Sequence, residues 1–480
     1  MITRRAMLTA AAAGGLSSVV APASAALARA EKGAAAARST AGGSLRVGAA
    51  RVDITPPENP TYPELTEFGF EKANLRAIVV DNRGKRAALI GVATGSIDQP
   101  IFTDVIGKVA AELKTPVANV IVSATHVHSA TVPGSPIATS AWANTPGYLA
   151  NAAVNAVKQA TARLEPALVG YSTGQAYLNV NRDAIDPKTQ LWTQAANLDG
   201  PVDRTVAVLS FVRPGGAPIA AYVTYAMHAI NSYLTDYLSA DFPEAMSQWV
   251  DEAFGGDTVT VFAQNASGDV NPLWLRTGTD VLASKEGAAV TGYEQTREPI
   301  EEPLRDAKVP NKPADPKLVR QLFEYERALG IILGEEVIRV MSHTDATDGD
   351  PQIWGAQHTV TCPGRTRLDD AREGVPGVYK DGPDVDILTG VLGIGDVAIT
   401  TVAAEIYTRI ALRIKDESPM KNTMVATLAN GKAASGYIPD EQSWGHLTFQ
   451  VLGSKLKPGC AEAGIVNSTT SLISQYAGAR

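Results

Sequence analysis

Cysteine and histidine are scarce in this chain, whose 480 residues include two cysteines and six histidines. The two cysteines, Cys362 and Cys460, cannot build the multi-disulfide framework of a small secreted domain, and they cannot hold zinc without other ligands. They can still pair with each other in an oxidising compartment. A metal site in this chain must therefore use mainly histidine and oxygen ligands.

Clusters of basic residues are absent, and so are long apolar runs after the N-terminal segment. The formal net charge is −8, and an acidic chain without basic clusters argues against nucleic acid and anionic membrane surfaces as partners. No later apolar run reaches the roughly 18 residues that a transmembrane helix needs. We therefore expect a small-molecule or lipid substrate, no nucleic-acid partner and no transmembrane segment, while the oligomeric state stays open.

Residues 1–28 have the features of an export signal. Arg4 and Arg5 precede an apolar, alanine-rich segment, and residues 23–25 form an A-x-A cleavage site. The arginine pair indicates the twin-arginine route, although an ordinary Sec signal with two arginines would look similar. Residues 29–44 are rich in alanine, glycine and serine, which predicts a disordered leader. The expected location is secreted, periplasmic or in the cell envelope.

The remaining chain, residues 45–480, has the pattern of an α/β fold. Apolar runs of strand length alternate with amphipathic helical segments, without the strict rhythm of a parallel sheet. We expect a mixed β-sheet core flanked by helices. Residues 296–317, rich in proline and charge, predict a surface excursion. The predicted strands are 45–52, 77–81, 87–92, 120–123, 167–171, 206–212, 218–225, 258–262, 352–361, 397–402 and 447–452, and the predicted helices are 104–113, 147–164 and 318–341.

The stretch 120–129 begins as a β-branched apolar run and ends in a His-x-His pair, His126 and His128. In an extended backbone, residues i and i+2 point to the same face, so both imidazoles would leave the strand end toward one point. Two converging imidazoles are a natural start for a metal site. Two half-exposed loop histidines would give the same spacing.

Further polar groups follow apolar runs elsewhere in the chain. His228 and Glu405 each come at the end of one, and a polar turn with Asp269 and Asn271 follows another. Strand ends are where α/β folds place active sites. Each feature also has an ordinary interpretation, as a core histidine, a solvated carboxylate or a surface turn. Tyr437 lies on a turn near the C-terminus and alone means little.

Taken together, these pieces resemble the neutral (non-lysosomal) ceramidases and their bacterial relatives. The matching pieces occur in family order between Gly48 and Trp444, most of the chain after the leader. They are the segments 48–56, 125–129, 179–182, 202–205 and 268–272, together with His228, Glu405 and Tyr437. The resemblance implies a single ceramidase-like catalytic domain over residues 45–480.

The resemblance also implies a zinc amidohydrolase with a defined ligand set. In ceramidases the first histidine of Thr-His-x-His is a zinc ligand, which corresponds to His126 in this sequence. The isolated strand-end histidine, the late glutamate and the late tyrosine are the other protein ligands, which correspond to His228, Glu405 and Tyr437. The second histidine of the motif stands beside the metal and contacts the reacting group, which corresponds to His128.

Three further residues complete the expected catalytic set. Arg182 is a candidate for holding a polar substrate group, and Asp269 and Asn271 belong to the turn Gly-Asp-Val-Asn-Pro. Ceramidases carry Gly-Asp-Val-Ser-Pro there, and their serine is a candidate nucleophile. An asparagine amide cannot attack a carbonyl, so the mechanism expected here is attack by metal-bound hydroxide, with zinc bringing bound water to a pKa near about 7.

The predicted function is therefore that of a secreted zinc-dependent hydrolase that cleaves an amide bond of a ceramide-like N-acyl compound. Ceramidases continue into a β-sandwich domain that helps to engage lipid, and the residues after Tyr437 are too few to form one. That difference and Asn271 leave open a zinc hydrolase of an ester, lactone or glycoside. A non-catalytic relative is a further alternative, which the intact set of His126, His228 and Glu405 opposes.

Overall fold

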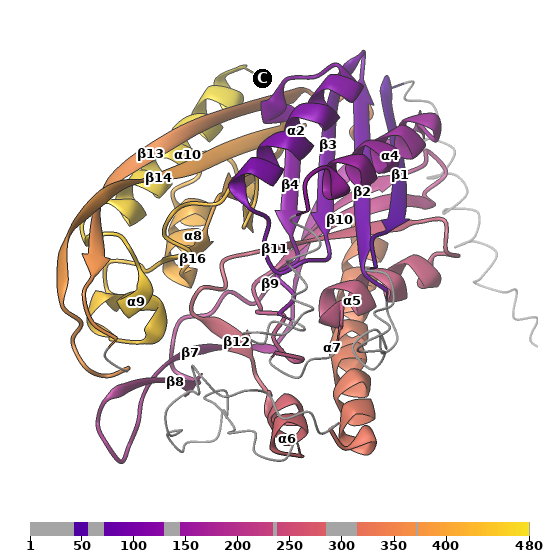
Figure 1. The fold of residues 1–480 in the computed structure, drawn as a ribbon. Helices are drawn as coiled ribbons and strands as arrows, with labels where there is room; N and C mark the ends of the chain where they lie inside the picture. The colour runs from indigo at the N-terminus through magenta and orange to yellow at the C-terminus, as the bar shows by residue number, and fades with distance from the viewer. Residues whose placement is uncertain are drawn as a thin grey trace, which may run out of the picture. The chain divides into compact units, whose positions relative to one another are not determined.

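The computed structural model describes residues 43–55, 72–128, 145–233, 238–284, 314–370 and 373–479, and the statements that follow concern these residues. The predicted export signal, nearly all of the predicted leader and most of the predicted excursion at 296–317 lie outside them. The described chain is a mixed α/β structure with several sheets (Figure 1).

The first sheet has five strands in the order β4-β3-β2-β1-β5. Strands β1, β2 and β3 form an antiparallel meander, and β3 pairs in parallel with β4 after a crossover through helix α2. Arg83 and Gly84 both have positive φ, as the two central residues of a tight hairpin turn require. The bounds are β1 Leu45–Asp53, β2 Asn74–Asn82, β3 Lys85–Val92, β4 Val120–Ala124, β5 Glu165–Pro166 and α2 Gln99–Leu113.

The second sheet has the order β11-β10-β9-β6 and packs face to face against the first. Helices α2 and α4 cover the outer face of the first sheet, and helices α5 and α7 cover the outer face of the second. The result is four layers, helix–sheet–sheet–helix. The bounds are β6 Leu168–Gln175, β9 Thr205–Val212, β10 Pro218–Tyr225, β11 Val259–Gln264, α4 Tyr148–Ala162, α5 Asp241–Ala253 and α7 Pro316–His343.

A third large sheet, β13-β14-β15-β17, packs with helices α8 and α10, and Cys362 of β13 is disulfide-bonded to Cys460 just before α10. Two small sheets, β12-β7-β8 and β16-β18, complete the pairing. The bounds are β7 Asn179–Ile185, β8 Trp192–Asn197, β12 Val270–Pro272, β13 Ile353–Arg367, β14 Tyr379–Ile394, β15 Val397–Val402, β16 Glu405–Ile406, β17 Asn422–Thr427, β18 Tyr437–Ile438, α6 Arg276–Ser284, α8 Thr408–Asp416, α9 Phe449–Gly453, α10 Ala461–Ala479, η2 Val117–Asn119 and η3 Ser443–Gly445.

The segment after β17 lies along the free edge of β4. Asn430 has a positive φ, and its side-chain amide accepts from the Val122 N–H at 2.8 Å and donates to the Val120 carbonyl at 2.8 Å. The Asn430 N–H donates to the Val122 carbonyl at 2.9 Å, and Ala429 bridges to Ser123. Residues 428–430 therefore occupy the position that a further strand would take, beside the point where β4 leads to His126.

The predicted mixed α/β class is confirmed, and one predicted strand is wrong. Residues 447–452 were expected to be extended, but 449–453 form the short helix α9, in which the Leu452 N–H donates to the Thr448 carbonyl. Periodicity cannot separate a strand from a helix in so short an apolar run. Among the described residues, no helix is both long enough and apolar enough to cross a membrane.

Candidate metal centre

His126 lies in the turn after β4, with the backbone in a left-handed conformation, φ 66°. This is rare for a residue with a side chain and costs about 1 kcal/mol or more, so the surrounding contacts must hold it. The His126 N–H donates to the Thr94 carbonyl, and the Thr125 N–H donates to the Val92 carbonyl. We expected an extended strand to direct both histidine side chains toward one point. This is wrong in detail, because β4 ends at Ala124 and the turn that follows it directs the two side chains.

Backbone contacts join the segments that carry His128 and His228. The His128 N–H donates to the Ala229 carbonyl at 2.8 Å, and Val127 forms a parallel bridge with Ala229. The His228 N–H donates in turn to the Val270 carbonyl at 3.4 Å. The ends of β4 and β10 and the start of β12 therefore lie side by side, which is how three distant parts of the sequence meet at one site.

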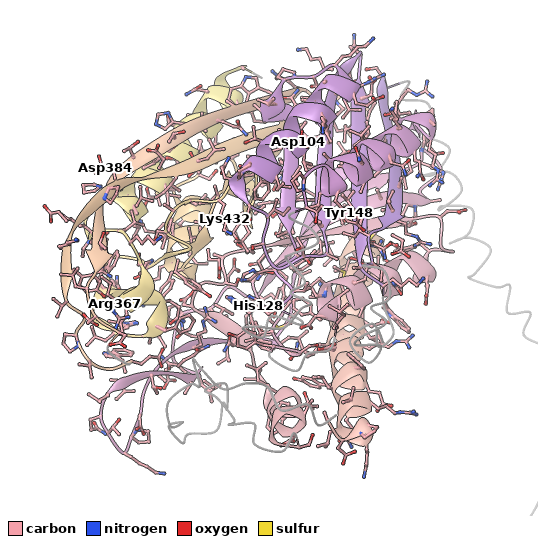
Figure 2. All side chains as sticks on the ribbon, in the orientation of Figure 1. Asp104, His128, Tyr148, Arg367, Asp384 and Lys432 are labelled. Carbon is pink, nitrogen blue, oxygen red and sulfur yellow. A yellow bond between two sulfur atoms is a disulfide. The ribbon has the colours of Figure 1, made fainter. Side chains whose placement is uncertain are left out.

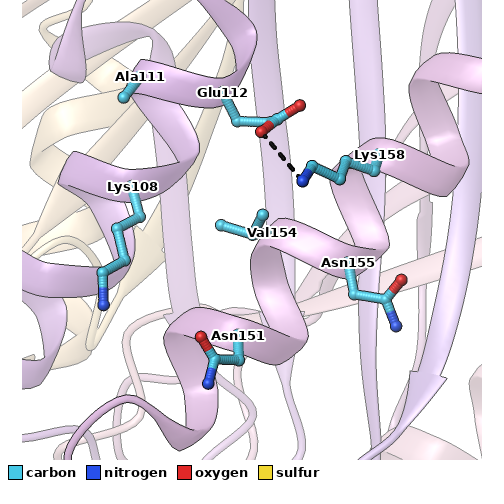
Figure 3. Close-up of a pocket in the computed structure, with 7 residues that line it drawn as sticks. All are labelled: Lys108, Ala111, Glu112, Asn151, Val154, Asn155 and Lys158. Carbon is cyan, nitrogen blue, oxygen red and sulfur yellow. Dashed lines mark ion pairs between the residues drawn. The ribbon is translucent and has the colours of Figure 1, made fainter.

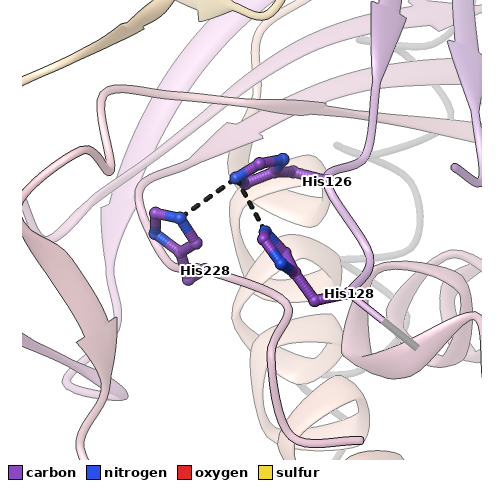
Figure 4. Close-up of side chains that lie close together, drawn as sticks. All are labelled: His126, His128 and His228. Atoms are coloured by element: carbon purple, nitrogen blue, oxygen red, sulfur yellow. Dashed lines mark hydrogen bonds between the residues drawn. The ribbon is translucent and has the colours of Figure 1, made fainter. Parts of the chain in front are cut away.

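The ring nitrogens of the three histidines converge (Figure 4). His126 Nε2 lies 3.0 Å from His228 Nε2 and 3.0 Å from His128 Nε2. The Glu405 Oε2 atom lies 3.0 Å from His126 Nε2 and 3.1 Å from His228 Nε2. The three predicted ligands His126, His228 and Glu405 are thus together, and His128 joins them closely enough to be a fourth candidate ligand.

The hydrogen bonds of the rings show which nitrogens face the centre as lone pairs. His126 Nδ1 lies 2.8 Å from the Gly95 carbonyl, and His228 Nδ1 lies 2.9 Å from the Val270 carbonyl. A carbonyl only accepts, so each Nδ1 carries the proton and each Nε2 presents a lone pair. Among the residues that the structure describes, the buried Oε2 atom of Glu405 has no hydrogen-bond donor. The Nε2 lone pairs of His126 and His228 and the Oε2 atom of Glu405 face one another, which is the arrangement that a bound cation satisfies, so these residues fit a metal ion.

The protonation states also suit metal binding. Burial lowers the pKa of His228 to about 3, and burial and the neighbouring imidazoles lower the pKa of His128 well below its usual value. Burial opposes ionisation of Glu405, but His126 and His228 beside it lower the pKa of that carboxyl well below its usual value. Metals bind neutral imidazoles and ionised carboxylates. The lowered pKa values of His228 and His128 favour neutral imidazoles at neutral pH, and the lowered pKa of Glu405 favours the ionised carboxylate.

Tyr437 lies directly beside Glu405. The two-residue strands β16 and β18 pair in parallel with Glu405 opposite Tyr437. The Tyr437 ring lies 5.5 Å from the Arg182 guanidinium carbon and meets Phe449 edge-on. Burial and the Glu405 carboxylate raise the pKa of the Tyr437 phenol above its usual value. The position agrees with the expected ligand role, which stays a prediction.

Arg182 is almost completely buried, although the sequence suggested a contact with substrate. Its guanidinium donates to the Gly268 carbonyl at 2.6 and 3.2 Å and to Asn271 Oδ1 at 3.2 Å. The same group lies against the rings of Tyr437 and Phe449, at 5.5 and 5.3 Å from their centroids. These contacts support a positioning role for Arg182, in which it holds Asn271 and Tyr437 in place.

Asp269 also makes its contacts inside the protein. Its Oδ1 accepts from the N–H and the hydroxyl of Thr408, both at 2.8 Å, and its Oδ2 accepts from Asn181 Nδ2 at 3.0 Å. Burial and the nearby Asp183 carboxylate raise the pKa of Asp269 to about 7. Asp269 therefore links the turn before β12 to β7 and to the start of α8, where a carboxylate complements the helix dipole.

Sequence reasoning missed the groups that orient the ligands. The Gly95 and Val270 carbonyls fix the ring orientation of His126 and His228, and Phe449 packs against both Tyr437 and Arg182. Backbone carbonyls leave no signature in a sequence. Gly95 gave one available signal, since it is a glycine in a turn directly after the apolar strand β3. A Cβ at Gly95 would lie 2.7 Å from the Val127 carbonyl oxygen.

Comparisons with known proteins bear on the same residues. Residues 63–287 match the family model "Neutral/alkaline non-lysosomal ceramidase, N-terminal". The curated relative Neutral ceramidase B of Dictyostelium discoideum is 25% identical over 262 residues, which are 49% of this chain and 36% of the relative. The resemblance to the neutral ceramidases is confirmed. The family match contains His126, His128, His228 and Asn271, while Glu405 and Tyr437 lie beyond it.

Solved ceramidase structures share the fold. A structure titled "Ceramidase complexed with C2" aligns with a TM-score of 0.62 at 15% identity, covering 90% of this chain and 74% of that chain. The neutral ceramidase from Pseudomonas aeruginosa aligns with a TM-score of 0.59 at 15% identity, covering 90% of this chain and 75% of that chain. Because both alignments cover 90% of this chain, the ceramidase fold is shared over most of it. The sequence match to Neutral ceramidase B spans about a third of that relative's length.

Proposed function

We propose that this protein is an exported zinc-dependent hydrolase that cleaves the amide bond of a ceramide-like N-acyl compound. The observation that carries the proposal is the convergence of the Nε2 lone pairs of His126 and His228 on the Glu405 carboxylate, within 3.1 Å. These three residues would hold the metal, and Tyr437, which lies beside Glu405 in the β16–β18 pair, would be the fourth protein ligand. Nitrogen and oxygen donors without cysteine suit a catalytic zinc site that keeps an open position.

A zinc ion held there would supply a Lewis acid and water of lowered pKa. The protein residues supply orientation and proton handling. The carbonyls of Gly95 and Val270 lock the two imidazoles, so the site is rigid before substrate arrives. Arg182 fixes the position of the turn before β12 relative to the Tyr437 phenol, because it contacts Gly268, Asn271 and Tyr437.

His128 is the residue best placed to handle protons. The side chains of His126 and His228 are 4% and 1% exposed, Glu405 is 11% exposed, and His128 is half-buried. His128 is therefore the most exposed of these four residues. Because burial lowers its pKa, His128 is neutral at pH 7 and can take a proton from the attacking water or hydrogen-bond the developing oxyanion.

A second candidate keeps the metal and changes the scissile bond to an ester, lactone or glycoside. The observation that favours it is Asn271, which is 2% exposed and bonded to Arg182, in the motif where ceramidases carry serine. A hydrolase without a side-chain nucleophile is not restricted to amides, since water activated at a metal attacks several kinds of bond.

Export is part of the proposal. The adjacent Arg4 and Arg5 before an apolar segment support a signal peptide of the twin-arginine type. The Cys362–Cys460 disulfide supports an oxidising compartment. Replacing both arginines by lysine should block export and leave folded protein in the cytoplasm, which fractionation detects. Unchanged secretion would indicate the Sec route.

Metal analysis and a substrate panel test the function. Elemental analysis of the exported protein should find one zinc per chain, and His126→Ala and His228→Ala should each lose metal and activity together. A panel of N-acyl amides, esters, lactones and glycosides should give the highest kcat/KM for amides. Full metal content in either variant would show that the ligand assignment is wrong. A preference for esters, lactones or glycosides with zinc bound would support the second candidate.

A further inference from the structure

A small apolar pocket lies beside Glu405, between the start of α2 and the segment that follows β17. Its apolar wall is formed by Ile97, Phe102, Ala403, Leu428 and Ala433, and Glu405 lines one part of it. Its volume is about 60 Å³. We call it the Glu405 pocket. None of the three histidines lines it, so it is distinct from the ligand cluster while touching a residue of that cluster.

The Glu405 pocket touches the candidate metal centre through Glu405. Glu405 and His128 are the more exposed members of the cluster, and the pocket reaches Glu405. Ser96, which also lines it, follows Gly95, whose carbonyl orients His126. The pocket is therefore an apolar recess that shares one residue, Glu405, with the ligand cluster. An apolar recess next to a polar reactive centre is how binding sites hold the non-reacting part of a substrate.

One part of the lining of the Glu405 pocket is polar. Lys432 lines it, is exposed, and pairs with Asp98 at 2.7 Å, while the Lys432 N–H donates to Gln99 Oε1 at 2.7 Å. Lys432 is labelled in the central part of Figure 2, between α2 and the C-terminal segments. An alkyl chain long enough to reach Lys432 would meet this ion pair and lose part of the gain from burial.

The volume sets the length of the group that fits. A dry apolar cavity of about 150 Å³ holds a benzene ring, so a pocket of about 60 Å³ holds roughly two or three carbon atoms. We propose that the Glu405 pocket binds the alkyl part of the substrate's acyl group and restricts it to a short chain, from acetyl to about butyryl. This proposal rests on the proposed hydrolase function and names its substrate class as short-chain N-acyl compounds.

The groove between α2 and α4 serves as a reference surface. It is an open surface groove with a volume of about 620 Å³, and Glu112 and Lys158 are paired across it (Figure 3). None of its lining residues belongs to the ligand cluster. Ala111 lies in this groove on the exposed side of α2. Ala111→Leu is therefore a control that adds the same atoms as Ala433→Leu, but outside the Glu405 pocket and the ligand cluster.

Binding of straight-chain carboxylates to the zinc-loaded protein tests the proposal without depending on turnover. Acetate, propionate, butyrate, hexanoate and octanoate are titrated by calorimetry into the wild-type protein, Ala433→Leu, Phe102→Leu and Ala111→Leu. In the wild type, affinity should rise about fourfold per methylene up to butyrate and then stop rising. Ala433→Leu should bind acetate normally and butyrate at least tenfold more weakly, while Phe102→Leu should extend the rise toward hexanoate. Ala111→Leu should match the wild type.

Hydrolysis of the corresponding N-acyl amides separates this proposal from the function on which it rests. If short N-acyl amides are cleaved but Ala433→Leu and Ala111→Leu share one chain-length profile, the pocket assignment is wrong and the hydrolase stands. If the carboxylates show the expected length dependence but no amide is cleaved, the amidase function is wrong and the pocket stands. A wild-type protein that binds octanoate more tightly than butyrate, or binds no carboxylate, overturns the pocket proposal. Should Ala433→Leu not fold, Phe102→Leu tests the same assignment, because it enlarges the pocket and should shift the preferred chain length upward.

Discussion

His126 and Asn271 are both buried near the same centre, but they contact different kinds of atoms. His126 Nε2 faces other lone pairs, whereas Asn271 Oδ1 accepts a hydrogen bond from Arg182. Asn271→Ala should therefore keep the metal and lower kcat by at most about 10²–10³-fold, the effect of one lost hydrogen bond that acts in the transition state. His126→Ala should be far less active because it loses the metal. Metal analysis and measurement of kcat for both variants test the expected order of activity, in which the wild type is above Asn271→Ala and Asn271→Ala is above His126→Ala.

Ser267 provides the control for that comparison. It lies in the same turn, is buried, and its hydroxyl accepts from Gln264 Nε2 at 2.6 Å. Because its role here is to hold the turn, Ser267→Ala should retain substantial activity. Trapping a covalent acyl group on Ser267, or finding Ser267→Ala as inactive as His126→Ala while still folded and loaded with metal, would overturn attack by activated water.

Asp269 should make stability depend on pH. Burial and Asp183 raise its pKa to about 7 in the folded protein, against about 3.9 in an unfolded chain. A raised pKa means that the folded state holds the proton more tightly, so this contribution to stability is complete below about pH 4 and is lost as the pH rises through about 7. Relative to Asp269→Asn, which does not titrate, the wild type should lose unfolding free energy with rising pH across this window.

Urea unfolding of the two proteins at several pH values between about 4 and 8 measures this difference. Other titrating groups are the same in both proteins, so their contributions cancel in the difference. A difference in unfolding free energy that stays constant with pH would show that the Asp269 carboxyl titrates normally in the folded protein.

At the scale of the secondary-structure elements, the turn between β3 and α2 carries the carbonyl of Gly95, which orients His126 in the candidate metal centre. A methyl group at Gly95 would lie 2.7 Å from the Val127 carbonyl oxygen, so Gly95→Ala must move the carbonyl that orients His126. Loss of such an orienting group typically costs about 10–100-fold in metal affinity. Competition with a zinc chelator should show a decrease of that size, without loss of the fold.

Gly107 offers a matched control for that substitution. It lies on the exposed side of α2, and a Cβ there would meet no atom within 4 Å. Gly107→Ala should leave zinc affinity unchanged and stabilise the protein by about 0.5–1 kcal/mol, because glycine is costly inside a helix. If both substitutions leave zinc affinity unchanged, the Gly95 carbonyl does not orient His126.

The elements that sequence predicts well are those with a strong local pattern. The β2–β3 hairpin, the helices α4 and α7, and the strands β4 and β10 that lead to His126 and His228 were all expected and are present. The two-residue ladder β16–β18 was not, because two residues carry no periodicity, yet it sets Glu405 beside Tyr437. The internal contacts of Arg182 and Asp269 were not predictable either. They depend on which backbone groups the turns bring within reach, and sequence spacing does not contain that information.

At the scale of the whole molecule, the Cys362–Cys460 disulfide closes a loop with a sequence separation of 98 residues. A cross-link of that span stabilises mainly by restricting the unfolded chain, and its loss typically costs about 2–5 kcal/mol. Cys362→Ala/Cys460→Ala should therefore unfold at lower urea concentration. Zinc affinity of the folded protein should be unchanged, because neither β13 nor α10 supplies a predicted ligand.

The wild-type protein treated with dithiothreitol is the control, since it loses the bond without changing the sequence. It should unfold at the same urea concentration as the double variant. Coincident unfolding curves for oxidised and reduced wild type would mean that the disulfide adds nothing to stability.

The segment 428–430, which covers the edge of β4, affects more than the local fold. An open edge strand is a template for pairing with another copy of the chain, and Asn430 prevents this by using the Val122 N–H and the Val120 carbonyl. Leu428 of the same segment also forms part of the wall of the Glu405 pocket. Widening the pocket from this side, to admit longer substrates, would expose β4 to intermolecular pairing and aggregation. Widening it at Phe102, on α2, would leave the edge covered.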